Sequence, residues 1–180
     1  MDRTGFSFLI AACALAGVTL AAQTQTPLPI RAGLWQVRIE SEVNGQKTPD
    51  MAERMKSMTP ETRAKMEAAM KQRGMDPASN GGTKACYSGE MIERGRLSEL
   101  TGGCKIDFGS RSSTSWKWHY SCPQLATEGD SEAIFSSPGN YVVKSSSVTN
   151  GSKARTSTTT ITAKWLAADC GDLKPVQLNP

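Results

Sequence analysis

The stretch SWKWHYSC, residues 115 to 122, alternates large apolar side chains with polar ones at a period of two. Successive side chains of a β-strand point to opposite faces of a sheet, so this pattern predicts a strand with two different faces. One face holds Trp116, Trp118, Tyr120 and Cys122. The other holds Lys117, His119 and Ser121, and His119 is the chain's single histidine. We therefore expect His119 to face solvent rather than to act in catalysis.

The preceding segment, CKIDF at residues 104–108, predicts a second strand, separated from the first by the polar residues GSRSST. A hairpin turn centred near residue 113 would place Cys104 opposite Cys122 and bring Ile106 and Phe108 onto the aromatic face. The apolar side chains and both cysteines then point to the same face of the sheet. This register predicts a disulfide between Cys104 and Cys122.

The N-terminus predicts a secretory signal peptide over residues 1–22. Arg3 precedes an apolar run that ends in small residues, which suits cleavage after Ala21 or Ala22. The run is short for a membrane span, so we expect no stable membrane anchor after cleavage. Cys13 lies in LIAAC, which is similar to a lipoprotein cleavage site, but the apolar run continues past it. We expect a periplasmic or secreted protein.

Removal of that segment leaves four cysteines, an even number in an exported chain. Two disulfides are the expected use of such a set. If Cys104 pairs with Cys122, Cys86 remains for Cys170. Zinc is the competing use of four cysteines, but the chain contains no CxxC pair.

Most of the remaining sequence predicts strands. GLWQVRIESEV, residues 33–43, alternates around one apolar face, and Asn44-Gly45 supplies a turn after it. From residue 103 onward, short β-patterned runs are separated by turn dipeptides such as Pro138-Gly139 and Asn150-Gly151. We predict one mainly β domain over residues 23–180, of the α+β class. Its strands form an antiparallel meander, as a curved sheet or partial barrel.

A helical insertion interrupts this pattern at about residues 50–74, after the first strand. Its composition favours helix, Thr59 can cap and Pro60 suits a first helical position. The segment is rich in methionine: Met51, Met55, Met58, Met66 and Met70. Thioethers could bind Cu(I) weakly. Docking of the helices on the sheet or on a partner is the interpretation we favour.

Five short motifs occur in a fixed order along the chain: GLWQV, ACYS, GGC, the SC that ends the tryptophan-bearing strand, and AADCG. In this order they resemble the bacterial exported family catalogued as domain of unknown function 3617, over about residues 33–170. The resemblance implies a small exported β-rich domain without an established activity, and it carries no catalytic residue onto this chain. The family's loop rich in Met and Pro is replaced here by the longer, charged, Met- and Ala-rich segment.

The catalytic residue types and motifs that the sequence contains argue against catalysis. No serine lies in a GxSxG motif, and disulfides would consume the thiols. Several acids of the β region could in principle serve a hydrolase, but nothing singles out a pair. These acids are Asp107, Glu128, Asp130 and Glu132. The net charge of +4 is scattered, so we expect no nucleic-acid partner.

The sequence therefore predicts a noncatalytic domain without a cofactor or metal, which binds a protein partner or a small apolar ligand. The residues expected to line such a ligand site are Trp35, Trp116, Trp118 and Tyr120, with Phe135 and Trp165 as further members of the aromatic face. A filled core is the competing interpretation of the same face. An exported hydrolase with unidentified carboxylates and weak Cu(I) binding remain as alternatives.

Overall fold

The computed structural model describes residues 27–78, 82–93, 104–152 and 154–176. In these residues, nine strands form one antiparallel sheet with the order β3-β4-β1-β9-β8-β7-β6-β5, and β2 pairs with β1. The strands are β1 (Gly33–Val43), β2 (Gln46–Lys47), β3 (Met75–Pro77), β4 (Thr83–Tyr87), β5 (Lys105–Arg111), β6 (Ser115–Cys122), β7 (Thr127–Ser137), β8 (Asn140–Thr149) and β9 (Arg155–Ala167). The expected signal peptide, residues 1–22, lies outside this part of the chain.

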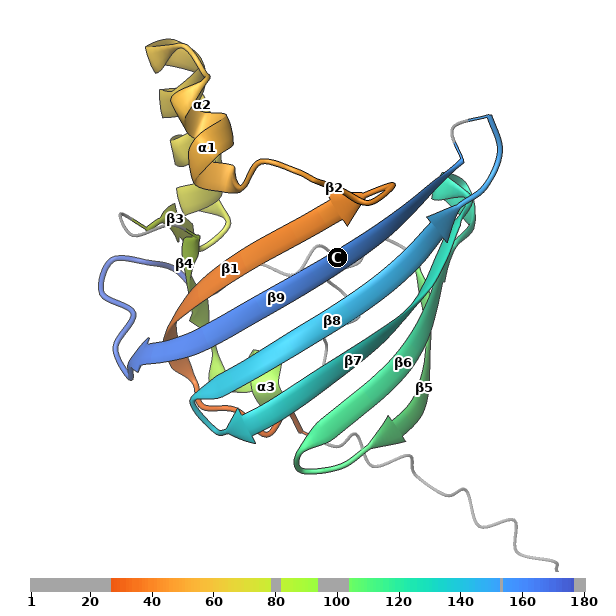
Figure 1. The fold of residues 1–180 in the computed structure, drawn as a ribbon. Coiled ribbons are helices and arrows are strands. Elements are labelled where there is room, and N and C mark those ends of the chain that lie inside the picture. The colour runs from red at the N-terminus through yellow and green to blue at the C-terminus, as the bar shows by residue number, and fades with distance from the viewer. Residues whose placement is uncertain (1–26, 79–81, 94–103, 153, 177–180) are drawn as a thin grey trace, which may run out of the picture.

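The prediction of a mainly β, antiparallel fold is confirmed. The long strands lie side by side and the sheet curves around a concave face (Figure 1). The sheet does not close, because β3 and β5 stand at opposite ends of the strand order. Twist and coiling of a long antiparallel sheet produce this shape without closure.

Strands β5 to β9 form a meander of consecutive antiparallel neighbours, and β9 then pairs with β1. The β1–β9 register runs from Trp35 opposite Trp165 to Val43 opposite Ser157, with an irregularity beside Leu34. The first long strand, β1, is thereby paired with the last strand, β9. This pairing places the apolar face of β1 on the same concave side as the aromatic face of β6.

The turn after β1 follows from its two residues. Asn44 and Gly45 have φ values of 51° and 77°, and Val43 is opposite Gln46 across the hairpin. Two positive φ values in a two-residue loop match the type I′ geometry that suits the strand twist, and Asn-Gly is its preferred sequence.

Three α-helices occur in the described residues: α1 (Met51–Lys56), α2 (Pro60–Gln72) and α3 (Gly89–Glu93). Asp50 caps α1 in a capping box with Glu53, and Thr59 caps α2 ahead of Pro60. Helices α1 and α2 stand beyond the β3 and β2 end of the sheet, whereas α3 lies by its concave side (Figure 1). None of the helices in the described ranges combines the length and hydropathy needed to cross a membrane.

The core lies on the concave side. Ile92 of α3 and Leu28 of the segment before β1 belong to the same buried cluster as Trp35 and Trp116. The amide of Leu28 donates to the carbonyl of Ile92 over 3.1 Å. A short helix and an N-terminal segment therefore cover the aromatic part of the sheet.

Candidate functional site

The four residues expected to line a ligand site do not share one environment. Trp35 and Trp116 have an exposed fraction of 0%, and both belong to the core cluster. Trp118 and Tyr120, which follow Trp116 by two and four residues on the same face of β6, are half-buried. Trp35 and Trp116 thus offer no surface to a ligand in this structure.

The buried tryptophans pack in a continuous aromatic cluster. Trp116 meets Phe108 and Phe135 edge-on, with ring centroids 5.8 and 5.9 Å apart, distances typical of aromatic pairs. The indole nitrogen of Trp116 donates to the carbonyl of Ser112, and that of Trp35 to the carbonyl of Arg31, each over 3.0 Å. Every polar atom of these two rings is therefore satisfied within the fold, as expected of core residues.

Two tyrosines complete this cluster. The hydroxyl oxygens of Tyr87 and Tyr141 lie 2.9 Å apart, and both rings pack against Trp35. Burial raises the pKa of Tyr87, while its hydrogen bond to Tyr141 lowers it in part. Burial, aided by the charge and hydrogen bond of Tyr87, raises the pKa of Tyr141 well above its ordinary value of 10.0. Both phenols are thus held neutral inside the core.

The opposite, outer face of the sheet is hollowed. A hollow of about 690 Å³ crosses strands β5 to β9. Its charged or ionisable lining residues are Asp107, Lys117, His119, Asp130, Glu132 and Lys144. Its outer hydroxyls come from Ser146, Thr158 and Thr160. We call this set of residues the outer trough.

Strand alternation explains the composition of the outer trough. Trp118, Ser131, Ser145 and Thr159 also border it, although the strand alternation assigns their side chains to the concave face. The side chains that project into it are those at the polar positions of each strand. Lys117 is opposite Glu132, and Glu132 is opposite Lys144, so the register brings opposite charges together on neighbouring strands.

One cross-strand ion pair and one histidine–carboxylate hydrogen bond are formed there. Lys117 Nζ lies 3.4 Å from Glu132 Oε1, and His119 Nδ1 lies 3.0 Å from Asp130 Oδ1. The side chains of His119 and Asp130 are 48% and 79% exposed, so water screens the pair. Within the described ranges, no hydroxyl or thiol forms a hydrogen bond with His119. This geometry supplies an aspartate and an imidazole but not the nucleophile of a triad.

The four candidate carboxylates divide between two hollows. Asp107, Asp130 and Glu132 line the outer trough, whereas Glu128 borders a smaller hollow of about 190 Å³ beside Cys122. The described residues contain no group of three or more His, Cys, Asp or Glu side chains placed to hold a metal ion. Asp130 thus bonds to His119, and Glu132 forms an ion pair with Lys117.

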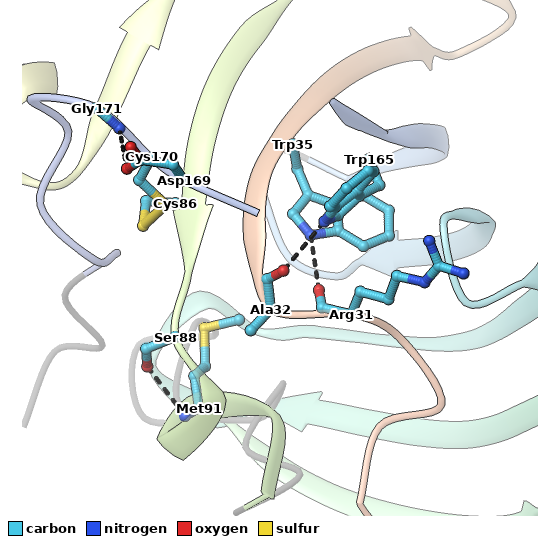
Figure 2. Close-up of a disulfide and its surroundings, with 10 residues drawn as sticks. All are labelled: Arg31, Ala32, Trp35, Cys86, Ser88, Met91, Trp165, Asp169, Cys170 and Gly171. Atoms are coloured by element: carbon cyan, nitrogen blue, oxygen red, sulfur yellow. Dashed lines mark hydrogen bonds between the residues drawn. A yellow bond between two sulfur atoms is a disulfide. The ribbon is translucent and has the colours of Figure 1, made fainter. Parts of the chain in front are cut away.

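Both expected cysteine pairs are disulfides in the structure. Cys104 and Cys122 have Cα atoms 4.3 Å apart, and Cys86 and Cys170 have Cα atoms 5.6 Å apart. The second bridge joins the segment after β9 to β4 (Figure 2). The amide of Val176 adds a bond to the carbonyl of Cys86 over 2.8 Å. Two disulfides indicate that the protein resides in an oxidising compartment.

The methionines of the helical segment are not equally accessible. Met55 and Met70 are 6% and 7% exposed, whereas Met51, Met58 and Met66 are half-buried. The backbone carbonyl of Met55 accepts a bond from Arg63, which ties α1 to α2. Two of the five methionine side chains, those of Met55 and Met70, are therefore buried by the packing of the helical segment.

The strand alternation of residues 115–122 predicts Lys117 and His119 on the face opposite the aromatic side chains, but it does not predict a site there. The signal that could have found it is the opposition of Lys117, Glu132 and Lys144. That opposition becomes visible only once the register of β6, β7 and β8 is known.

Comparison with known proteins gives one family and one relative. A family model described as "Protein of unknown function (DUF3617)" matches residues 30–170, from the segment before β1 to the last cysteine. A Pseudomonas putida protein described as "Uncharacterized protein in lpd-3 5'region" is 30% identical over 112 residues, which cover 59% of this chain and 77% of that protein. No solved structure matches the chain significantly.

Proposed function

We propose that this protein, which belongs to the DUF3617 family of proteins of unknown function, is an exported periplasmic domain that binds a protein partner and catalyses no reaction. The observation that carries this proposal is the division of the sheet into two faces. The concave face is packed around Trp35 and Trp116, while the outer face presents a trough of about 690 Å³ lined by charged and hydroxyl-bearing residues.

The character of the outer trough favours a protein partner over a small apolar ligand. Sites for small apolar molecules are enclosed and lined mainly by hydrophobic side chains. The outer trough is broad, and it presents two lysines, three carboxylates and several hydroxyls. Such groups give specificity and register to a protein interface, in which charged pairs and hydroxyls meet complementary groups of the partner.

Export is supported by the two disulfides together with the N-terminal sequence. The bridges Cys86–Cys170 and Cys104–Cys122 would not persist in a reducing cytosol. Residues 1–22 carry the pattern of a cleaved secretory signal. We therefore assign the mature domain to the periplasm.

We propose that the protein catalyses no reaction because the side chains that could react are already paired with other side chains of the fold. Asp130 pairs with His119, and Glu132 pairs with Lys117. Tyr87 and Tyr141 are bonded to each other in the core. A hydrolase would need two carboxylates directed at one substrate bond, and Asp130 and Glu132 are each directed at a neighbouring strand instead.

A pair of matched variants tests the proposal. The double variant Lys117→Glu and Lys144→Glu reverses both lysines of the outer trough. Lys164→Glu reverses an exposed lysine at the corresponding alternation of β9, outside the trough. Each tagged protein is expressed with its signal sequence in its own bacterium, cross-linked and recovered from the periplasm.

We expect wild-type protein and Lys164→Glu to recover the same partner chain and the double variant to lose it by about tenfold or more, because charge reversal at a polar interface is costly. Equal recovery by the double variant would refute the assignment of the outer trough. Circular dichroism and the disulfide count serve as controls for folding.

A further inference from the structure

The sheet has one long edge in the described part of the chain. Strand β5 ends the strand order and pairs there with β6 alone, whereas the other end consists of the three-residue β3. An edge strand presents unpaired backbone donors and acceptors, which can accept a further strand. The edge of β5 is therefore the place where this sheet can be extended.

The direction of the free backbone groups follows from the β5–β6 register. Residues directly opposite in an antiparallel pair alternate between hydrogen-bonded pairs, with Cα atoms about 5.5 Å apart, and non-hydrogen-bonded pairs, at about 4.5 Å. Cys104 and Cys122 are 4.3 Å apart at their Cα atoms, so theirs is a non-hydrogen-bonded pair. Two residues further on, Ile106 opposite Tyr120 is of the same kind. The N–H and C=O of Ile106 thus point away from β6, toward the free edge.

The side chains around Ile106 are self-complementary. Lys105 and Asp107 flank it and are exposed on the outer face, and Ile106 itself is half-buried on the concave face. Within the described ranges, neither Lys105 nor Asp107 takes part in an ion pair. If a second β5 lies antiparallel to the first with Ile106 on the two-fold axis, Lys105 of each copy falls opposite Asp107 of the other.

We propose that a second copy of this chain pairs with the β5 edge, to form a symmetric dimer with one continuous sheet. Ile106 lies opposite the partner's Ile106, and both exchange their outward N–H and C=O groups. Lys105 faces the partner's Asp107, and Asp107 faces the partner's Lys105. This is the isologous, closed contact expected of a two-fold dimer.

The structure also limits the extent of this contact. The register shifts between Phe108 and Ser110, so the regular edge ends at Gly109. Bulges of this kind interrupt pairing at sheet edges. The interface is accordingly smaller than the roughly 1,600 Å² of a standard complex, and we expect a weak dimer that forms at high protein concentration. Asp107 also lines the outer trough, but a monomeric domain could still bind the trough's partner, so failure of the dimer and failure of the proposed function can be told apart.

Charge reversal and restoration test the dimer. Sedimentation velocity of the mature, disulfide-bonded protein is measured over a range of concentrations. Lys105→Asp places like charges opposite each other twice, as does Asp107→Lys. We expect each to weaken dimerisation by roughly tenfold or more, because two symmetry-related pairs become repulsive. The double variant Lys105→Asp with Asp107→Lys restores opposite charges, and we expect it to regain the wild-type dimer.

The register itself is tested by a cysteine on the two-fold axis. Ile106→Cys should form a disulfide-linked dimer on mild oxidation, because the residue faces its own copy. Lys105→Cys faces Asp107 instead and should link more slowly. A wild-type protein that remains monomeric at about 1 mM overturns the proposal. The proposal is also overturned if dimerisation is weakened by the same factor in the two single charge-reversal variants and in the double variant.

Discussion

The hydroxyl oxygens of Tyr87 and Tyr141 lie 2.9 Å apart, although Tyr87 belongs to β4 and Tyr141 to β8. Strands β1 and β9 lie between them in the sheet, so the two phenols meet across the concave side. Both rings pack on Trp35, with centroids 5.6 and 5.4 Å from it. This pair therefore joins the short-strand end of the sheet to its centre through the core.

The raised pKa values of Tyr87 and Tyr141 predict a loss of stability in alkaline solution. The folded protein holds both phenolic protons more tightly than the unfolded chain does, because burial disfavours the phenolates. The stabilisation is full below the ordinary tyrosine pKa of about 10 and is lost as pH rises through the folded-state values. Between about pH 9 and pH 11, we expect the free energy of urea unfolding to fall by at least about 1 kcal/mol more in wild type than in Tyr87→Phe/Tyr141→Phe.

Tryptophan fluorescence follows this unfolding, and Tyr120→Phe serves as the control because Tyr120 lies outside the pair. All other side chains are common to the three proteins, so only the difference between the curves is interpreted. Parallel curves for wild type and the double variant would show that the pair has no role in the alkaline transition.

Truncation of the two tryptophans of β6 should separate core from surface. Trp116 is fully buried, so we expect Trp116→Ala to lower the free energy of unfolding by about 3 to 5 kcal/mol. Trp118 is half-buried on the concave face, where it packs against the core cluster, and Trp118→Ala should cost about half as much or less. Chemical denaturation at neutral pH measures both. Equal losses would mean that Trp116 is not the packing centre of the sheet.

The two disulfides should differ in their contribution to stability. Cys86–Cys170 spans 84 residues and Cys104–Cys122 spans 18, and loop-closure entropy grows with the length of the loop. Replacement of both cysteines of a bridge by alanine should therefore cost about 1 kcal/mol more for the longer loop. Thermal and urea unfolding of the two double variants compare them. A larger loss for the shorter loop would contradict this entropic account.

The long strands and the Cys104–Cys122 pair could be predicted largely from local sequence. The period-two alternation of residues 115–122 fixes which side chains share a face, and Ile106 is found opposite Tyr120 and Phe108 opposite Trp118, as the proposed register requires. Asn44-Gly45 likewise defines its turn through its own conformational preferences. In these places a few neighbouring residues carry the information.

Other features depend on contacts between distant segments. The short strands β2 and β3 have two and three residues, too few for a period to be recognised. The pairing of β1 with β9 joins residues more than 100 positions apart, and no local pattern specifies it. Whether Trp35 and Trp116 lined a cavity or filled a core depended on Leu28 and Ile92, which approach from outside the sheet.

The methionines of the helical segment should not bind Cu(I). Met55 and Met70 are buried, and a soft-metal site would need several thioether sulfurs directed at one point. We expect a Cu(I) titration under anaerobic conditions to leave the methionine methyl signals in the NMR spectrum unmoved. A saturable shift of the signals of Met51, Met58 or Met66, absent from the corresponding leucine variants, would establish the copper alternative.

Native mass spectrometry of the protein purified from its own periplasm detects whatever the domain retains, and so distinguishes a protein-binding domain from one that encloses a ligand. We expect a mature chain beginning near Gln23 that carries two disulfides, copurifies with a second protein chain and retains no small molecule. A stoichiometric apolar small molecule, released when the protein is denatured, would contradict this expectation, because the concave face would then enclose a ligand rather than a packed core.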